Sequence, residues 1–217
     1  MPIKKELKMI FNEFFEKRLN ESITFAWKIF QEKVGTGLIE INKEASMQLH
    51  YAYILQSILP LILFSKDESA NVELEKTVNL GRKTREVDLF LTGRKEKKEY
   101  KIAIEMKCYR ELAASGGKRG ATDIFMNSVY LDIEKLEKYE ELGLCDDVIF
   151  LAMNDFVPLI YPQNKKAKCW DYDISHGVTI GPKEIQTPIG GKEQNVSIKK
   201  CYSFNWEQNG KYYFLKL

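Results

Sequence analysis

The segment Lys101-Ile-Ala-Ile-Glu-Met-Lys-Cys-Tyr109 alternates between apolar side chains and a second, more polar set. Successive residues of a β-strand point to opposite faces of the sheet, so the two sets are predicted to separate. The set predicted to face the core is Ile102, Ile104 and Met106. The set predicted to face the other way is Ala103, Glu105 and Lys107. A carboxylate and an ammonium group are therefore expected side by side near the end of an apolar strand.

A second acid lies in the preceding apolar run, Val87-Asp88-Leu89-Phe90-Leu91. Sixteen residues separate Asp88 from Glu105 (105 − 88 − 1), which is enough for the end of one strand, a turn and the adjacent strand. Two carboxylates from neighbouring strands can converge on one divalent cation. Oxygen ligands suit a hard ion such as Mg²⁺ or Mn²⁺.

The triplet Glu-x-Lys is weak as a signal by itself, because it also begins at Glu6, Glu96 and Glu99. Those copies lie in charged sequence, whereas Glu105 follows an apolar alternation and an acid on the previous strand. The alternative interpretation is a cross-strand ion pair on a solvated face of the sheet.

The rest of the chain predicts an α/β fold with a mixed central sheet flanked by helices. Helices are expected at 3–33, 42–60 and 123–142, and strands at 72–80, 85–91, 101–109 and 147–153. The first three strands read as an antiparallel meander, and the continuous apolar run 147–153 as a strand buried on both faces. A C-terminal hairpin is expected from 199–204 and 211–216 around Asn209-Gly210.

This arrangement resembles the PD-(D/E)xK nuclease superfamily, which includes type II restriction endonucleases, over about Glu44 to Met153. Asp88 matches the family's first acid, with Val87 where many members have proline, and Glu105-Met106-Lys107 matches the (D/E)-x-K triplet. Glu44 matches an acid that many members carry on a helix before the strands. The resemblance implies a restriction endonuclease-like core at 41–160. The residue patterns add N-terminal helices at 1–40 and a C-terminal β-rich extension at 161–217, and we expect one nuclease domain over 1–217.

The resemblance also implies roles for these residues. Asp88, Glu105 and the backbone carbonyl of Met106 would hold Mg²⁺ or Mn²⁺ against a phosphate oxygen. Lys107 would orient or help deprotonate the attacking water, or stabilise the pentavalent phosphorus. Glu44 would contact a second metal ion or its water shell. Hydrolysis of the DNA phosphodiester bond would leave a 5′-phosphate.

Charge is distributed unevenly, although the net charge is only +2. Lys and Arg outnumber Asp and Glu by 13 to 6 over 76–120, whereas acids outnumber bases by 9 to 2 over 121–160. This pattern suits a protein that meets a polyanion on one face. The residues considered for DNA contact are Arg82, Lys83, Tyr109, Arg110, Lys118 and Arg119. For the glycine-rich loop at 115–120 and the hairpin turn at 81–84, the alternative is a solvated basic surface.

Other classes of protein are disfavoured. The four cysteines form no C-x-x-C pair and the two histidines are isolated, which argues against a disulfide framework, a zinc cluster or a histidine-centred nuclease site. The apolar stretch 51–64 is interrupted and too short to cross a membrane. We therefore expect a cytoplasmic enzyme that acts on double-stranded DNA, and by resemblance a homodimer.

Three functions are compatible with these residues. The first is a sequence-specific restriction endonuclease. The second is a nuclease of the same fold that recognises a DNA structure or a free end, in repair or phage defence. The third is a nucleic-acid-binding protein that keeps the fold without catalysis.

Overall fold

The computed structural model describes residues 14–81, 83–113 and 115–217 and is built around a six-stranded sheet in the order β1-β2-β3-β4-β10-β9. The strands are β1 (Glu68–Asn79), β2 (Thr84–Lys95), β3 (Lys98–Tyr109), β4 (Asp147–Asn154), β10 (Tyr212–Lys216) and β9 (Glu207–Asn209). The first three form the expected antiparallel meander, and β3 pairs with β4 in parallel. The sheet is therefore mixed, as predicted.

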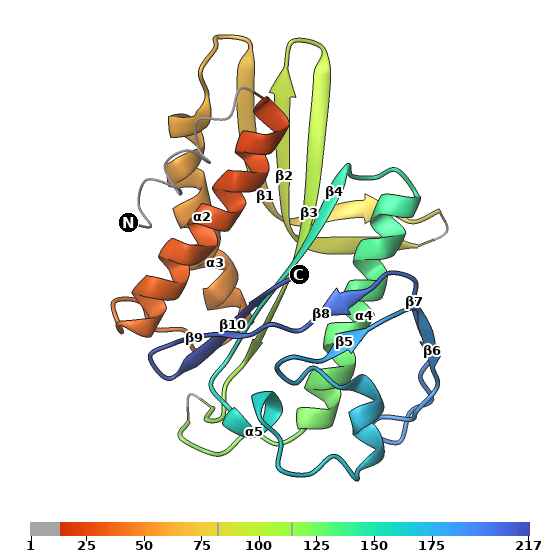
Figure 1. Ribbon diagram of the computed structural model, residues 1–217. Helices are drawn as coiled ribbons and strands as arrows, with labels where there is room; N and C mark the ends of the chain where they lie inside the picture. Colours follow the sequence, from red (N-terminus) through yellow and green to blue (C-terminus); the bar gives the residue numbers. More distant parts are fainter. Residues whose placement is uncertain (1–13, 82, 114) are drawn as a thin grey trace.

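Helices cover both faces of this sheet (Figure 1). One face packs against α2 (Phe15–Gly35), α3 (Glu44–Ile58) and the short 3₁₀ helix η1 (Leu59–Ile62), and the other packs against α4 (Thr122–Glu141). The α4 helix joins β3 to β4, because a parallel pair needs a crossover connection. The part of the predicted 3–33 helix before residue 14 lies outside the described residues.

The alternation predicted for β3 is confirmed. Ile102, Ile104 and Met106 belong to the core on the α2–α3 side, whereas Ala103 belongs to the core on the α4 side. The alternative interpretation, an ion pair on a solvated face of the sheet, is excluded, because α4 covers this face and Glu105 is only 1% exposed.

The C-terminal extension lies mainly against α4 and contains two small strand pairs. The short helix α5 (Val157–Ile160) precedes it, and its elements besides β9 and β10 are η2 (Lys168–Tyr172), β5 (Thr179–Ile180), β6 (Lys183–Ile185), β7 (Val196–Ile198) and β8 (Tyr202–Ser203). The pairs are β5 with β8 and β6 with β7.

The predicted C-terminal hairpin is partly wrong. The turn at Asn209-Gly210 exists, but β10 pairs with β9 at 207–209 rather than with 199–204. Residues 199–202 are held elsewhere, since Glu137 of α4 accepts hydrogen bonds from the backbone N–H groups of Lys199 and Lys200 and from the Tyr202 hydroxyl.

The β9–β10 turn packs directly on the end of α2. Gly210 has a φ of 58°, and a Cβ added there would lie 2.4 Å from the carbonyl oxygen of Gly35. Glycine at 210 satisfies both the left-handed backbone and the close approach. This contact fixes the hairpin against the helix.

The β1–β2 ladder is irregular opposite Asp88. Leu74 pairs with Leu89 and Lys76 with Val87, but the intervening Glu75 and Asp88 are not paired, and Glu75 has a φ of 49°. Val87 and Leu89 accordingly pack in the cores on opposite faces of the sheet. The alternation of β2 side chains between the two faces of the sheet is therefore interrupted at Asp88.

Among the described residues, no helix combines the length and the apolar character needed to cross a membrane.

A buried ion pair between Arg18 of α2 and Glu68 of β1 makes the free energy of unfolding depend on pH. Burial opposes the charged form of Glu68, but hydrogen bonds from Arg18, the Phe64 N–H and Lys95 outweigh it and lower the pKa of Glu68 from 4.5 to about 2. The folded state therefore gains stability above the unfolded pKa and loses it as the pH falls from 4.5 towards 2. We expect about 3 kcal/mol of this pH-dependent free energy of unfolding to disappear in Glu68→Gln. Urea unfolding of both proteins between about pH 2 and pH 6 measures it, and a pH-independent difference would contradict the expectation.

Candidate active site

The candidate site lies where β2 separates from β3. Their pairing runs from Lys95↔Lys98 to Leu89↔Ile104, whereas β3 stays paired with β4 as far as Tyr109. Beyond Ile104, the edge of β3 that β2 would otherwise cover is therefore open to other hydrogen-bond partners.

Beyond Ile104, two carboxylates accept the backbone hydrogen bonds of β3 on the edge where its pairing with β2 has ended. The Met106 N–H donates to Asp88 Oδ2 at 2.6 Å, and the Cys108 N–H donates to Glu44 Oε2 at 3.3 Å. Residues two apart in a strand direct their N–H groups to the same edge, so both acids lie along that edge. Backbone donors that would otherwise be unsatisfied thus bring Asp88 and Glu44 to the end of β3.

Lys107 lies between two acids from different helices. Its Nζ is 3.3 Å from Glu44 Oε1 on α3 and 2.8 Å from Asp132 Oδ2 on α4. Burial opposes the ammonium form, but the charges of Asp132 and Glu44 outweigh it and hold the pKa of Lys107 above its usual value. Lys107 is therefore a fixed cation at the centre of the site.

Glu105 is enclosed by α4. The Tyr139 hydroxyl donates to Glu105 Oε1 at 3.2 Å, and Lys135 Nζ lies 3.7 Å from Oε2. Burial, followed by repulsion from Asp88 and Asp132, raises the pKa of Glu105 to about 8. Burial likewise raises the pKa of Asp88 to about 6.

The cluster has more acids than bases. Four carboxylates (Glu44, Asp88, Glu105, Asp132) face two ammonium groups (Lys107, Lys135), which gives −2 when all are ionised. Burial is the main cause of the raised pKa values of Asp88 and Glu105, and repulsion from the neighbouring acids adds to it.

The predicted residues Asp88, Glu105, Lys107 and Glu44 are thus brought together, and the carbonyl of Met106 leaves the strand on the same edge as its N–H. Sequence reasoning missed three residues of α4: Asp132, Lys135 and Tyr139. Asp132 and Tyr139 fall on the same helix face as Val129 and Leu136, at spacings of three and four residues. An acid on an otherwise apolar helix stripe was the available signal for Asp132.

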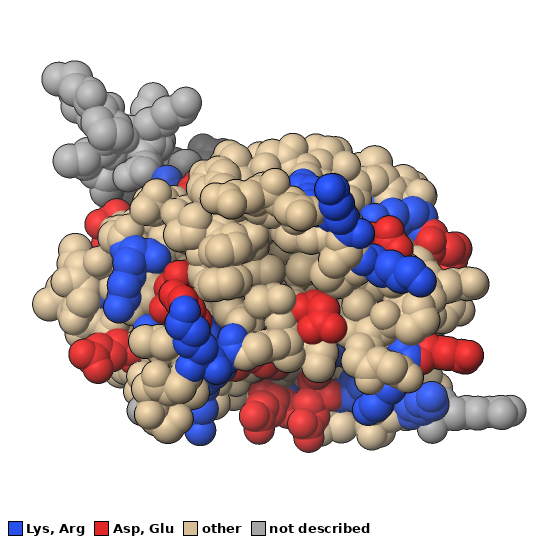
Figure 2. Space-filling model, turned by 90° about the horizontal axis from the view of Figure 1, so that it is seen from below, with Lys and Arg blue, Asp and Glu red and all other residues tan. Residues whose placement is uncertain are grey.

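Several of the predicted DNA-contact residues also make contacts within the protein. The Tyr109 hydroxyl donates to the carbonyl of Arg119 at 3.1 Å, Arg119 donates to the carbonyl of Asn42 at 3.2 Å, and Arg110 pairs with Asp155 at 2.7 Å. Lys118 is 83% exposed and 3.8 Å from Glu111, and Lys83 is exposed near the tip of the β1–β2 hairpin. Arg82 lies outside the described residues. On the face shown in Figure 2, basic and acidic side chains are interspersed.

Comparisons with protein-family models, with curated proteins and with solved structures found no match to this chain.

Proposed function

We propose that this chain is a divalent-metal-dependent endonuclease that hydrolyses DNA phosphodiester bonds, with a restriction endonuclease-like core. The observation that supports it best is the convergence of Asp88, Glu105 and Lys107 at the opening between β2 and β3, in a cluster with excess negative charge. A divalent cation offsets that excess.

The donor set suits a hard cation that keeps part of its water shell. Within 14–81, 83–113 and 115–217, no three His, Cys, Asp or Glu side chains form a ready metal-binding group. Mg²⁺ is commonly held by one or two carboxylates, with water and substrate phosphate completing the shell. Asp88 and Glu105 supply the carboxylates, and the Met106 carbonyl supplies a third oxygen.

The bound cation would neutralise charge on the reacting phosphate and acidify a water molecule. The chain's own residues do the positioning. Tyr139 and Lys135 orient the Glu105 carboxylate, while Glu44 and Asp132 hold the Lys107 ammonium group where it can orient water and stabilise phosphate charge. Hydrolysis adds water across the phosphodiester bond and leaves a 5′-phosphate and a 3′-hydroxyl.

The direct test is cleavage of plasmid and genomic DNA with Mg²⁺ or Mn²⁺, comparing the wild type with Asp88→Ala. We expect cleavage by the wild type and a loss of at least about 100-fold in the variant, because one of the two metal-binding carboxylates is removed. Urea unfolding of both proteins verifies that the variant is folded.

The products separate the candidate functions. Discrete bands favour a sequence-specific restriction enzyme, and end- or structure-dependent loss favours a repair or phage-defence nuclease. Equal cleavage by the Asp88→Ala variant would overturn the assignment. DNA binding without cleavage in either metal would favour a catalytically silent binding protein.

A further inference from the structure

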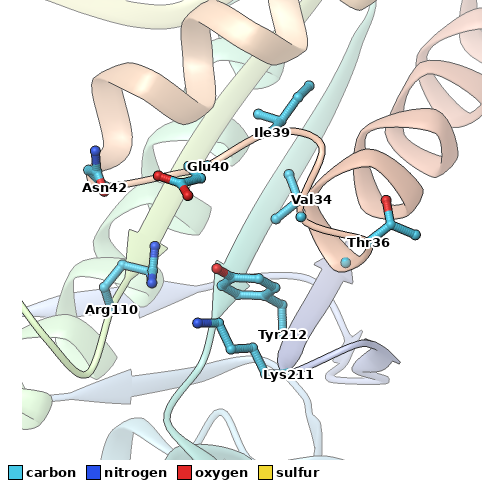
Figure 3. Close-up of a pocket in the computed structure, with 10 residues that line it drawn as sticks. Val34, Thr36, Ile39, Glu40, Asn42, Arg110, Lys211 and Tyr212 are labelled. Carbon is cyan, nitrogen blue, oxygen red and sulfur yellow. The ribbon is translucent and has the colours of Figure 1, made fainter.

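A polar pocket of about 530 Å³ lies beyond the C-terminal end of β3. Its wall is formed by the end of α2, the α2–α3 loop, the residue after β3 and the β9–β10 turn (Figure 3). This volume is within the range of small-molecule binding sites.

The pocket adjoins the candidate active site through two elements. Arg110, in its wall, follows Lys107 by three residues, which is about 10 Å along an extended chain. Asn42, also in its wall, precedes Glu44 by two residues. The pocket lies on the α2 side of the sheet, so a nucleic-acid strand held at Lys107 reaches its mouth by continuing past the end of β3 for one or two nucleotides.

The lining has a polar side and an apolar side. In Figure 3, Glu40 and Arg110 point towards each other on one side, with the Lys211 amine below them, and Val34 and Ile39 lie on the other. The Tyr212 hydroxyl points into the space between them. Such a site offers apolar contact for a base or sugar, the exposed Lys211 amine for a phosphate, and both donors and acceptors for a base edge.

The pocket is held open by rigid contacts. Arg110 is fixed by Asp155 at 2.7 Å, and its guanidinium lies 5.1 Å from the centre of the Tyr212 ring. The Gly35–Gly210 contact fixes the turn that carries Lys211 and Tyr212. Since these groups are positioned in advance, less conformational entropy is lost when a ligand enters.

We infer that this pocket binds one unpaired nucleotide of the DNA strand beside the bond that is cut, which makes DNA with single-stranded overhangs, flaps or gaps the substrate class. The inference rests on the proposed nuclease function. A base within duplex DNA enters the pocket only after it has been unpaired and unstacked. This step costs free energy, and an unpaired base avoids that cost.

The test is fluorescence anisotropy in EDTA, with labelled duplexes of equal length that are blunt or carry a short 5′ or 3′ overhang. We expect the wild type to bind one overhang duplex about tenfold more tightly than the blunt duplex. Lys211→Ala, in an exposed side chain, and Tyr212→Phe, which removes only the hydroxyl, should reduce that preference. Lys192→Ala, which removes an equal charge from an exposed position outside the lining, should retain it.

Equal affinity for blunt and overhang duplexes, or a preference unchanged in both pocket variants, would overturn the inference. Because binding is measured without a divalent ion, it is independent of cleavage. If cleavage depends on Asp88 but binding shows no overhang preference, the nuclease function is supported and the pocket is not a nucleotide site. If the protein never cleaves DNA but shows an overhang preference that depends on Lys211, the pocket is supported as a nucleotide site and the nuclease function is excluded.

Discussion

Glu105→Gln should lose metal-dependent DNA cleavage by at least about 100-fold and, in the absence of metal, should be more stable than the wild type. The loss follows from replacing the carboxylate that we propose to bind the metal ion with a neutral amide of nearly the same shape. Plasmid cleavage with Mg²⁺ measures the first effect, and urea unfolding in EDTA measures the second.

The gain in stability follows from the direction of the pKa shift. The pKa of Glu105 is raised from 4.5 to about 8 in the folded protein, so its contribution to stability is fully present below pH 4.5 and is lost as the pH rises through 8. Glutamine has no charge to bury and still accepts the Tyr139 hydrogen bond. Near pH 8 we expect a gain of about 2 kcal/mol or more in the free energy of unfolding.

Glu137→Gln is the matched control on the same helix. Glu137 is also buried, but its carboxylate accepts two backbone N–H bonds and the Tyr202 hydroxyl bond. An amide NH₂ facing these donors should cost about 1 to 3 kcal/mol of stability, while cleavage persists wherever the protein is folded. If Glu105→Gln cleaved at the wild-type rate, Glu105 would not be a metal-binding residue.

Lys107→Met should abolish cleavage, again by at least about 100-fold, and should also destabilise the fold. The substitution leaves Asp132, whose side chain is 3% exposed, and Glu44 without the ammonium group between them. Removing one partner from a buried ion pair costs about 3 to 5 kcal/mol, and Lys135, which also pairs with Asp132, offsets part of this loss. The same plasmid assay and urea unfolding measure both losses.

Lys107→Arg distinguishes catalysis from folding. Arginine keeps the positive charge between Glu44 and Asp132, but its planar guanidinium replaces a compact ammonium group. We expect this variant to keep most of the stability that Lys107→Met loses and to remain strongly impaired in cleavage. Wild-type cleavage by a stable Lys107→Met protein would exclude a catalytic role for Lys107.

Much of the fold follows from local patterns. The alternation at 102–107 identifies the two faces of β3, and the apolar run at 147–153 identifies a strand buried in the sheet, because burial acts on each residue through its own position in the strand. The acids Asp88 and Glu105 stand out since each is a charge within such a run.

The parts that could not be predicted depend on distant contacts. Residues 199–202 look like a strand, but Glu137, more than sixty residues away, binds their backbone. Arg119 and Tyr109 also make hydrogen bonds that hold the loop before α4, and the sequence gives no sign of these contacts. The pocket combines α2, β10 and the α2–α3 loop, and no short window of sequence contains its parts.

The capping of β3 by Asp88 and Glu44 also has a consequence for how the chain folds. The two acids lie 18 and 64 residues from the amides they bind, so the end of β3 is completed only after non-local contacts have closed large loops. A slip of β2 by one residue would turn Asp88 to the opposite face and leave the Met106 amide without its acceptor. A register error therefore costs the hydrogen bond that places Asp88 in the site. A chain that reaches the native register also brings Asp88 and Glu44 to the end of β3.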